Sequence, residues 1–206
     1  MTAVGRPVLG AVLAGGASRR MGTDKSLVDV AGSPLAARAA AALTAAGCDP
    51  VVVVGGDAAR LGELGLRVVA DRCPGEGPLD GIVRALELAS GSAAVVVACD
   101  MPQLSPATIA ALVSALAAAD GALDVVVARS QRREPLCAVW AVRALPVLIE
   151  AFDHGERAVH RVLEGLAVGE VGVADEQVRN VNTPADLAAV VVAAERAGAS
   201  GDEATG

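Results

Sequence analysis

The stretch VLGAVLAGGASRRMGTDK, residues 8–25, decides the fold class of this 206-residue chain. Residues 8–14 form a short apolar run, which predicts a buried strand. The run leads into Gly15 and Gly16, whose lack of a side chain lets the backbone adopt positive φ and approach a ligand closely. Successive N–H groups in such a loop form a concave site for anions. A strand that leads into a loop of this kind is typical of α/β sheets, in which ligands bind beyond the carboxyl ends of the strands.

Strands and helices alternate along the rest of the chain. We expect further strands at residues 51–54, 67–70, 94–99, 124–128, 135–140 and 168–173. Helices are expected at residues 33–47, 79–89, 105–119, 143–151 and 157–164, with a last one from Thr183 to about residue 198. Ser33, Ser105 and Thr183 each precede a proline, so we expect them to cap helices. This alternation predicts a single α/β domain over residues 1–198, with a mostly parallel sheet between helical layers. Residues 199–206 are expected to form a disordered tail.

Composition and charge exclude several classes of partner. The net charge is −7, and one Trp, one Phe and no Tyr leave few rings to stack on bases, so we expect no nucleic acid partner. No apolar run reaches the length of about 18 residues that a membrane helix needs, and no secretion signal is expected. The four cysteines are far apart with no CxxC pair. This spacing favours free thiols in a cytoplasmic protein over a disulfide framework or a zinc site.

The loop after the first strand also carries two cations, Arg19 and Lys25. Arginine binds phosphate as a planar fork and lysine as a point charge, so both are candidate ligands of a triphosphate. The loop matches neither the GxxxxGK[ST] pattern nor GxGxxG. The alternative is a surface loop with ordinary charges. A glycine pair, an arginine, a Met-Gly step and a lysine in one loop favour the phosphate-binding interpretation.

Asp100 follows the apolar run at residues 94–99, within the segment CDMP. A carboxylate at the end of a buried strand faces the ligand crevice. Mg²⁺ binds one or two carboxylates together with substrate phosphates and waters. Asp100 is therefore the candidate magnesium ligand; the alternative is an aspartate that only begins a turn before proline.

Two further segments carry polar candidates. Asp71 follows the expected strand at residues 67–70 and is a candidate to bind metal, ribose or base, or else a surface residue of a long loop. Asn180 and Asn182 share one face if their segment is extended. Their amides are candidates to donate to phosphate or to a pterin-like heterocycle, and the alternative is turn chemistry at a helix start. Three groups give weaker signals. Residues 155–157 are expected to contact an acceptor phosphate or to begin a helix, and residues 132–134 to form a solvated loop. His154 and His160 are expected to be surface or packing residues.

Together these motifs resemble those of the molybdenum cofactor guanylyltransferase family, over residues 12–187. Besides the Asp71 loop, the shared segments are LAGGASRRMGTDK (13–25), GPLDG (77–81), CDMP (99–102), EPLCAVW (134–140), GERAV (155–159) and NVNTPADL (180–187). The resemblance implies a Rossmann-like fold and a Mg²⁺-dependent reaction of GTP with molybdenum-molybdopterin. The products would be the guanine dinucleotide form of the cofactor and pyrophosphate. It also implies other cofactor biosynthesis proteins and recipient molybdoenzymes as partners.

The resemblance assigns roles by motif. Nucleotide contacts are implied for Leu13, Ala14, Gly15, Gly16, Lys25, Asp71 and Asp100. Asp100 would also hold Mg²⁺, Arg19 would assist at the phosphates, and Asn180 and Asn182 look like acceptor-side residues. Two positions depart from the family pattern. Asp80 stands where members often have alanine, and either accepts hydrogen bonds from guanine or faces solvent. Gly55 and Gly56 stand where an asparagine often follows the second strand.

Three alternatives compete with this interpretation. A cytidylyltransferase acting on the same cofactor tends to carry LAAG where this chain has LAGG, and it lacks GPLxG. An enzyme that makes sugar nucleotides or isoprenoid precursors shares the first motif but has no need of NVNTPADL. A protein that binds GTP without turnover is the third, and the presence of both Lys25 and Asp100 argues against it.

Overall fold

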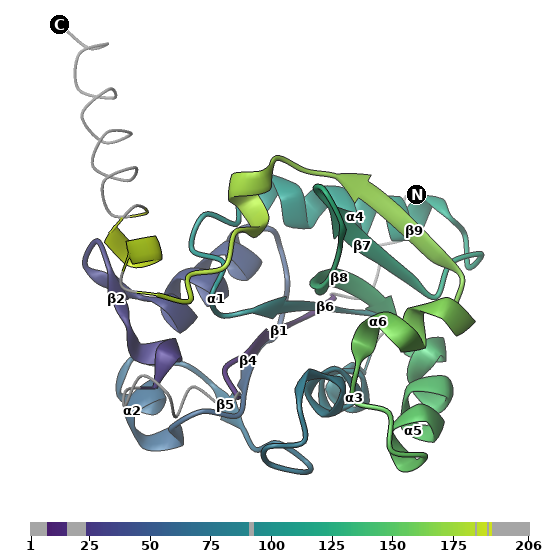
Figure 1. Cartoon of the computed structure of the whole chain (residues 1–206), viewed down its shortest axis with the longest axis horizontal. Helices are drawn as coiled ribbons and strands as arrows, with labels where there is room; N and C mark the ends of the chain where they lie inside the picture. The colour runs from purple at the N-terminus through teal and green to yellow at the C-terminus, as the bar shows by residue number, and fades with distance from the viewer. Residues whose placement is uncertain (1–7, 16–23, 91–92, 184, 189, 191–206) are drawn as a thin grey trace, which may run out of the picture.

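A seven-stranded sheet forms the middle layer of the molecule (Figure 1). The structure is a computed structural model, and it describes residues 8–15, 24–90, 93–183, 185–188 and 190. The strands lie in the order β5-β4-β1-β6-β8-β7-β9. Their bounds are β1 Leu9–Leu13, β4 Val51–Val54, β5 Val68–Val69, β6 Ala93–Ala98, β7 Val125–Arg129, β8 Arg133–Ala141 and β9 Val168–Gly172.

The sheet is mostly parallel, as the sequence predicts. Strands β5, β4, β1 and β6 run parallel to their neighbours, and β7 is parallel to β9. Strand β8 is antiparallel to both β6 and β7. All seven expected strands form, with bounds that differ from the expected ones by at most two residues. The reversed direction of β8 brings its first residues to the same edge of the sheet as the last residues of β6.

Burial on both faces explains why the central strands are apolar throughout. In β6, Ala94 and Val96 pack into one core, whereas Val95 and Val97 pack into a second core on the opposite face. Strand β1 is divided in the same way, and all five of its residues are buried. Strands with helices on both sides have no solvent-facing positions, so their sequences show no polar alternation.

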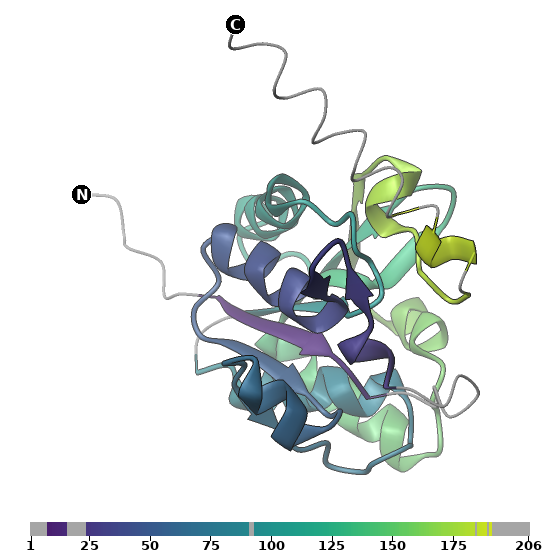
Figure 2. The same ribbon diagram turned by 90° about the vertical axis from the view of Figure 1, so that its left-hand side faces the viewer.

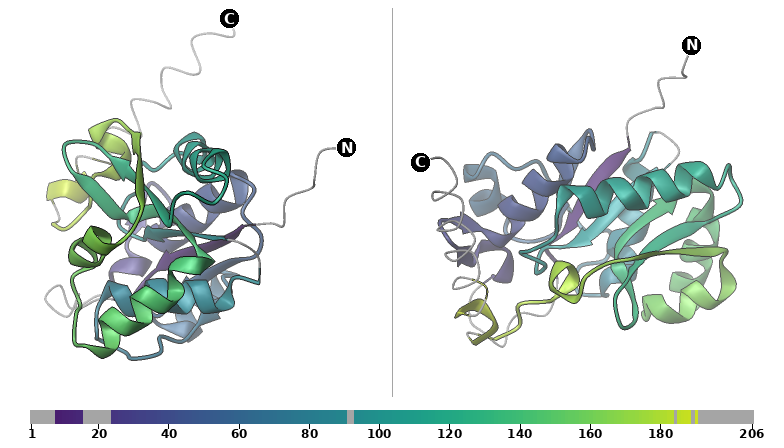
Figure 3. Two further views of the ribbon diagram at one scale, coloured as in Figure 1. Left: turned by 90° about the vertical axis from the view of Figure 1, so that its right-hand side faces the viewer. Right: turned by 90° about the horizontal axis from the view of Figure 1, so that it is seen from above.

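Two helical layers cover the sheet (Figures 2 and 3). Helices α1 (Leu35–Ala45) and α4 (Pro106–Ala118) lie side by side on one face. Helices α3 (Pro78–Leu88) and α5 (Leu145–Asp153) pack together on the other face, beside the short α6 (Val159–Val162). The 3₁₀ turns η3 (Val142–Ala144) and η4 (Leu163–Gly165) extend α5 and α6, and η5 (Asp175–Val178) follows β9. The predicted single-domain, three-layer α/β fold is confirmed.

Two local expectations were wrong or incomplete. Ser33 does not cap a helix: it pairs with Val30 in a small hairpin of β2 (Asp29–Val30) and β3 (Ser33–Pro34), and α1 begins after Pro34 without a side-chain cap. Helix α2 (Ala58–Glu63) was not expected. Its signal is Asp57, whose Oδ1 accepts hydrogen bonds from the N–H groups of the second and third residues that follow it.

The two other expected caps form. Oγ of Ser105 accepts the N–H of Thr108 at 3.2 Å at the start of α4. Oγ1 of Thr183 accepts the N–H of Asp186 at 3.1 Å, and the Asp186 carboxylate accepts the N–H of Thr183 in return at 2.8 Å. This reciprocal pair is a capping box. The expected helix end near residue 198 and the expected tail at 199–206 lie outside the described residues. Among the residues that are described, none of the helices has the length and apolar character to span a membrane.

Candidate active site

Four neighbouring parallel strands end at one edge of the sheet. Leu13 of β1 lies opposite Val54 of β4 and Ala98 of β6, so these strands end at the same level. Each strand leads into residues that the motifs single out: Ala14 and Gly15 after β1, Gly55 after β4, Asp71 after β5, and Asp100 after β6. The structure therefore brings these predicted residues together. Gly16 and Arg19 lie outside the described part of the chain.

Lys25, Asp100 and Asn182 form a polar cluster at this edge. Nζ of Lys25 donates to Oδ2 of Asp100 at 2.6 Å and to Oδ1 of Asn182 at 2.7 Å. The side chains of Lys25 and Asp100 are only 15% and 17% exposed. Three predicted site residues from distant parts of the sequence thus meet in one contact set.

Asp24 anchors the segment that presents Lys25. Its Oδ1 accepts the N–H of Ser26 at 3.0 Å and the hydroxyl of Ser26 at 2.7 Å. Its Oδ2 accepts the N–H of Asp57 at 3.2 Å. These bonds cap the 3₁₀ turn η2 (Lys25–Leu27) and tie it to the segment that follows β4. The lysine is therefore presented by a fixed backbone.

Two buried oxygens at the site have no hydrogen-bond partner in the described part of the structure. They are Oδ1 of Asp100 and Oδ1 of Asn180. The two segments that carry these oxygens are joined directly, because the N–H of Val181 donates to the carbonyl oxygen of Asp100 at 2.9 Å. Buried polar atoms without partners are rare in folded proteins, and a bound ion, a water molecule or a catalytic role accounts for many of them. The open carboxylate oxygen fits a hard cation such as Mg²⁺, which takes few protein carboxylates and many phosphate and water oxygens. Within the described residues, no three His, Cys, Asp or Glu side chains gather to hold a metal by themselves.

The Asp71 carboxylate fills a narrow gap between two glycines. A Cβ added to Gly55 would lie 2.6 Å from Oδ2 of Asp71, and one added to Gly15 would lie 2.9 Å from it. Gly55 also has a positive φ of 77°, which disfavours any other residue. Gly55 stands where members of the resembled family often have asparagine, and the structure gives a physical reason for this difference. The Asp71 carboxylate occupies the space that a side chain at position 55 would need.

Asp80 does not face solvent. It is 1% exposed, and its Oδ2 accepts the N–H of Cys73 at 2.9 Å. Its second oxygen is buried without a partner among the described residues. Burial raises the pKa of Asp71, and the negative charge of Asp80 raises it further. The two carboxylates therefore act on each other electrostatically.

A cavity of about 450 Å³ opens beside Asp100 and Asn180. It is also lined by Arg132, Arg133, Glu134 and His160. A more open cavity of about 480 Å³ adjoins it, shares Arg132, Glu134 and Asn180, and reaches Asn182. A third, mostly apolar cavity of about 490 Å³ lies near Val8 and Ala141, at the opposite edge of the sheet, and contains none of the predicted site residues.

Of the polar residues that line the first cavity, the sequence predicted Asp100 and Asn180 as site residues but not Arg132, Arg133, Glu134 or His160. The prediction of a solvated loop at residues 132–134 holds for Arg132, which is exposed and precedes the strand, but is wrong for Glu134, which lies in β8 with its side chain 12% exposed. The antiparallel course of β8 places Glu134 near the end of β6. His160 was interpreted as a surface or packing residue; it is exposed, and it lines the cavity. The only signal in the sequence was the continuity of the charged segment with the EPLCAVW motif.

Known proteins with similar sequences identify the family. A family model described as the MobA-like NTP transferase domain matches residues 10–171. The probable molybdenum cofactor guanylyltransferase of Opitutus terrae is 35% identical over 196 residues, which cover 90% of this chain and 96% of the relative. The molybdenum cofactor guanylyltransferase of Rhodobacter capsulatus is 37% identical over 188 residues, which cover 88% and 93%. This chain belongs to the molybdenum cofactor guanylyltransferase family. As a member of that family it is a nucleotidyltransferase.

Solved structures show the same fold. Molybdopterin-guanine dinucleotide biosynthesis protein A of Archaeoglobus fulgidus superposes with a TM-score of 0.75 at 26% identity, covering 92% of this chain and all of that one. A CMP:2-keto-3-deoxy-manno-octonic acid synthetase superposes with a TM-score of 0.70 at 15% identity, which shows a shared fold alone. The fold is therefore not confined to the molybdenum cofactor guanylyltransferase family.

Proposed function

We propose that this protein transfers GMP from GTP to the phosphate of molybdenum-molybdopterin, giving the guanine dinucleotide cofactor and pyrophosphate. The observation that carries the proposal is the cluster of Lys25, Asp100 and Asn182, with an open oxygen on Asp100, at the carboxyl ends of the parallel strands. The names of the relatives support GTP as the donor and this cofactor as the acceptor.

The nucleotide would bind along the edge formed by β5, β4, β1 and β6. Backbone groups of Leu13, Ala14 and Gly15 line the end of β1, with Gly16 and Arg19 next along the chain. Lys25 would move from Asp100 to the triphosphate, where its charge is attracted more strongly. Asp71 would contact the guanosine, since its gap lies on the β4–β5 side of the phosphate cluster.

The acceptor would bind in the cavity on the other side of Asp100. Asn180 lines that cavity with an oxygen that has no partner among the described residues. Arg132, Arg133 and His160 give the cavity basic groups that suit an anionic pterin phosphate. Asn182 lies between the cavity and Lys25, so it would sit near the junction of the two substrates. Asp100 would lie between the bound donor and the bound acceptor. The reacting α-phosphorus must lie at this boundary.

The reaction is a direct displacement. An anionic oxygen of the acceptor phosphate attacks the α-phosphorus of GTP, and a new P–O bond forms. The bond from the α-phosphorus to the bridging oxygen breaks, and its electron pair leaves with pyrophosphate. No general base is required, because the attacking oxygen already carries a negative charge. Lys25 and the backbone N–H groups align the phosphates and stabilise the developing charge. Mg²⁺ held by Asp100 would supply further positive charge at the phosphates.

The thiol of Cys99 lies beside the site in a buried position. Burial, with the charge of Asp100 added, raises the pKa of Cys99 to about 12. A thiol with this pKa stays protonated at neutral pH, and the nucleophilic form is the thiolate. This supports direct transfer without a covalent enzyme intermediate. The four free cysteines suit the expected cytoplasmic location, where we also propose other cofactor biosynthesis proteins and recipient molybdoenzymes as partners.

The test is incubation of the purified protein with molybdopterin-bearing acceptor, Mg²⁺, and GTP, CTP or ATP in separate reactions. We expect the guanine dinucleotide and pyrophosphate to form in equal amounts with GTP, and to disappear when Mg²⁺ is chelated. Equal or faster product formation with CTP would overturn the guanylyl assignment. An absence of product with every nucleotide would overturn the transfer itself.

A further inference from the structure

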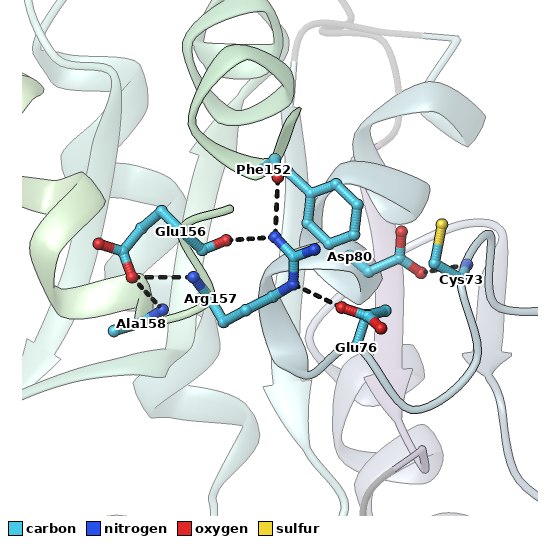
Figure 4. Close-up of polar contacts among 7 residues, drawn as sticks. All are labelled: Cys73, Glu76, Asp80, Phe152, Glu156, Arg157 and Ala158. Carbon is cyan, nitrogen blue, oxygen red and sulfur yellow. Dashed lines mark hydrogen bonds and ion pairs between the residues drawn. The ribbon is translucent and has the colours of Figure 1, made fainter. Parts of the chain in front are cut away.

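Side chains and backbone hold the loop at residues 71–77 at three positions, Arg72, Cys73 and Glu76, and Figure 4 shows the last two. Nε of Arg72 lies 3.3 Å from Oε1 of Glu87 in α3, and its guanidinium carbon lies 5.9 Å from the ring centroid of Phe152 in α5. Near its start, the N–H of Cys73 donates to Oδ2 of Asp80 at 2.9 Å. Near its end, Nε of Arg157 donates to Oε2 of Glu76 at 2.7 Å. Asp80 lies in α3, directly after the loop, whereas Arg157 is 81 positions from Glu76 and lies between α5 and α6. The contact of Glu76 with Arg157 therefore ties the loop to a distant part of the chain.

Arg157 is fixed in its orientation toward this loop. Its guanidinium carbon lies 3.9 Å from the ring centroid of Phe152, which is a cation–π contact. Its Nη1 donates to the carbonyl oxygens of Phe152 at 2.7 Å and Glu156 at 2.8 Å. Carbonyl groups at the carboxyl end of a helix attract cations. These contacts leave Nε directed at Glu76, as Figure 4 shows.

The segment around Arg157 is itself anchored. Oε1 of Glu156 accepts the N–H groups of Arg157 and Ala158, both at 2.8 Å. These bonds stabilise the charged carboxylate and thereby lower the pKa of Glu156. One turn later, His160 lines the cavity beside Asp100. The same short segment thus contacts the 71–77 loop on one side and the proposed acceptor cavity on the other.

The position of the loop decides the position of Asp71. Its carboxylate occupies a gap in which neither Gly15 nor Gly55 has room for a Cβ. In so narrow a gap, a shift of the loop moves the carboxylate either against the backbone or out of the crevice. A contact that immobilises the loop therefore also sets the geometry of the nucleotide side of the site.

We propose that Glu76 and Arg157 are positioning residues for nucleotide binding. Their ion pair completes the set of contacts that fix the 71–77 loop, and the loop places Asp71 between the two glycines. Nucleotide affinity thereby depends on the segment that borders the acceptor cavity. This inference rests on the proposed function in taking the crevice at Asp71 as the nucleotide site. The competing role of Arg157, a direct contact to the acceptor phosphate, predicts no effect on nucleotide binding when no acceptor is present.

The experiment measures nucleotide binding without acceptor, so that no transfer occurs. Calorimetry with GTP, CTP and ATP in Mg²⁺ is run on the full chain and on Glu76→Gln, Arg157→Gln and the double variant. Arg143→Gln is the matched control, because Arg143 makes a similar exposed ion pair with Asp124 at 2.8 Å and lines the apolar cavity away from the site. Glu76→Gln is the decisive variant, since Glu76 is half exposed and its change leaves the contacts of Arg157 with α5 in place.

We expect the Kd of the preferred nucleotide to rise about threefold to fivefold in Glu76→Gln, the upper range that an exposed ion pair transmits. The double variant should bind as Arg157→Gln does, because both changes remove one interaction. The KM for nucleotide should rise by the same factor with kcat retained, and the control should match wild type. Unchanged nucleotide binding in Glu76→Gln, or additive effects in the double variant, would overturn the proposal. If wild type preferred CTP, the guanylyl assignment would be overturned, and the effect of Glu76→Gln on CTP binding would still test the positioning role. If wild type bound no nucleotide, both the proposed function and the positioning role would be overturned.

Discussion

Nζ of Lys25 lies 2.6 Å from Oδ2 of Asp100, although 75 positions separate the two residues. The pair joins the segment after β1 to the end of β6, and these strands are parallel neighbours in the sheet. Lys25 also contacts Asn182, and the second carboxylate oxygen of Asp100 has no hydrogen-bond partner among the residues that the structure describes. A triphosphate that enters here meets a cation and a carboxylate whose positions are already set, which lowers the cost of organising the transition state.

Replacing Asp100 by asparagine should nearly abolish transfer while the fold is retained. The amide keeps an oxygen acceptor but loses the negative charge that attracts Mg²⁺, and it no longer pairs with Lys25. The measurement is turnover against Mg²⁺ concentration for wild type and Asp100→Asn, with far-ultraviolet circular dichroism as the folding control. We expect the half-saturating Mg²⁺ concentration to rise and the maximal rate to fall. Overlapping curves would mean that Asp100 only begins a turn and that the metal binds elsewhere.

Replacing Lys25 by alanine should lower kcat about 10²–10³-fold, the usual effect of removing one group that stabilises transition-state charge. The fold should persist, because Asp24 and not Lys25 caps the local 3₁₀ turn. Lys25 is also the only lysine in the chain, which allows a direct test of its position. An amine-reactive reagent should modify it slowly in wild type, faster in Asp100→Asn, and more slowly still when GTP and Mg²⁺ are bound. The terminal amino group serves as the internal control. Wild-type turnover in Lys25→Ala, or labelling that GTP leaves unchanged, would contradict the assigned role.

The sequence predicted the elements whose signals are local. Strand β6 and Asp100 could be placed because a run buried on both faces is apolar throughout and ends at a polar residue. The antiparallel direction of β8 has no local signal, since an apolar strand has the same composition in either direction. For that reason Glu134 and its neighbours were not assigned to the site. The contact of Glu76 with Arg157 was equally out of reach, because it exists only after α5 has packed against α3.

The stability of the protein should depend on pH through Asp71. Burial and the charge of Asp80 raise its pKa above the ordinary value of 3.8 in the folded state only. As pH rises through 3.8, the unfolded chain loses this proton first, so stability falls until the pH passes the folded pKa and then levels off. Asp71→Asn should therefore raise the free energy of unfolding at pH 7, and the gain should shrink as pH falls toward 4. Urea unfolding of both proteins between pH 4 and pH 7 measures this, and a gain that is constant with pH would refute the electrostatic cause. The same variant should bind nucleotide more weakly, which separates stability from function.

Replacing Gly55 by alanine should both destabilise the protein and displace Asp71. Two effects combine there: a positive φ of 77° and a Cβ that would lie 2.6 Å from Oδ2 of Asp71. Gly65 is the matched control, because its φ is 75° and a Cβ there would meet nothing within 4 Å. Gly65→Ala should cost about 1 kcal/mol from backbone strain alone. Gly55→Ala should cost about 2–4 kcal/mol because the collision adds to the strain.

A double-mutant cycle separates the collision from the strain. In Gly55→Ala combined with Asp71→Gly, the added methyl group no longer meets a carboxylate, so the extra cost should disappear and only the strain should remain. Nucleotide binding should not return, because the carboxylate proposed to contact the guanosine is absent. Urea unfolding gives the free energies of unfolding, and calorimetry with GTP and Mg²⁺ gives the affinities. If the effects of Gly55→Ala and Asp71→Gly on unfolding were additive, the carboxylate would not occupy the space beside Gly55, and the geometry of the nucleotide side of the site would have to be revised.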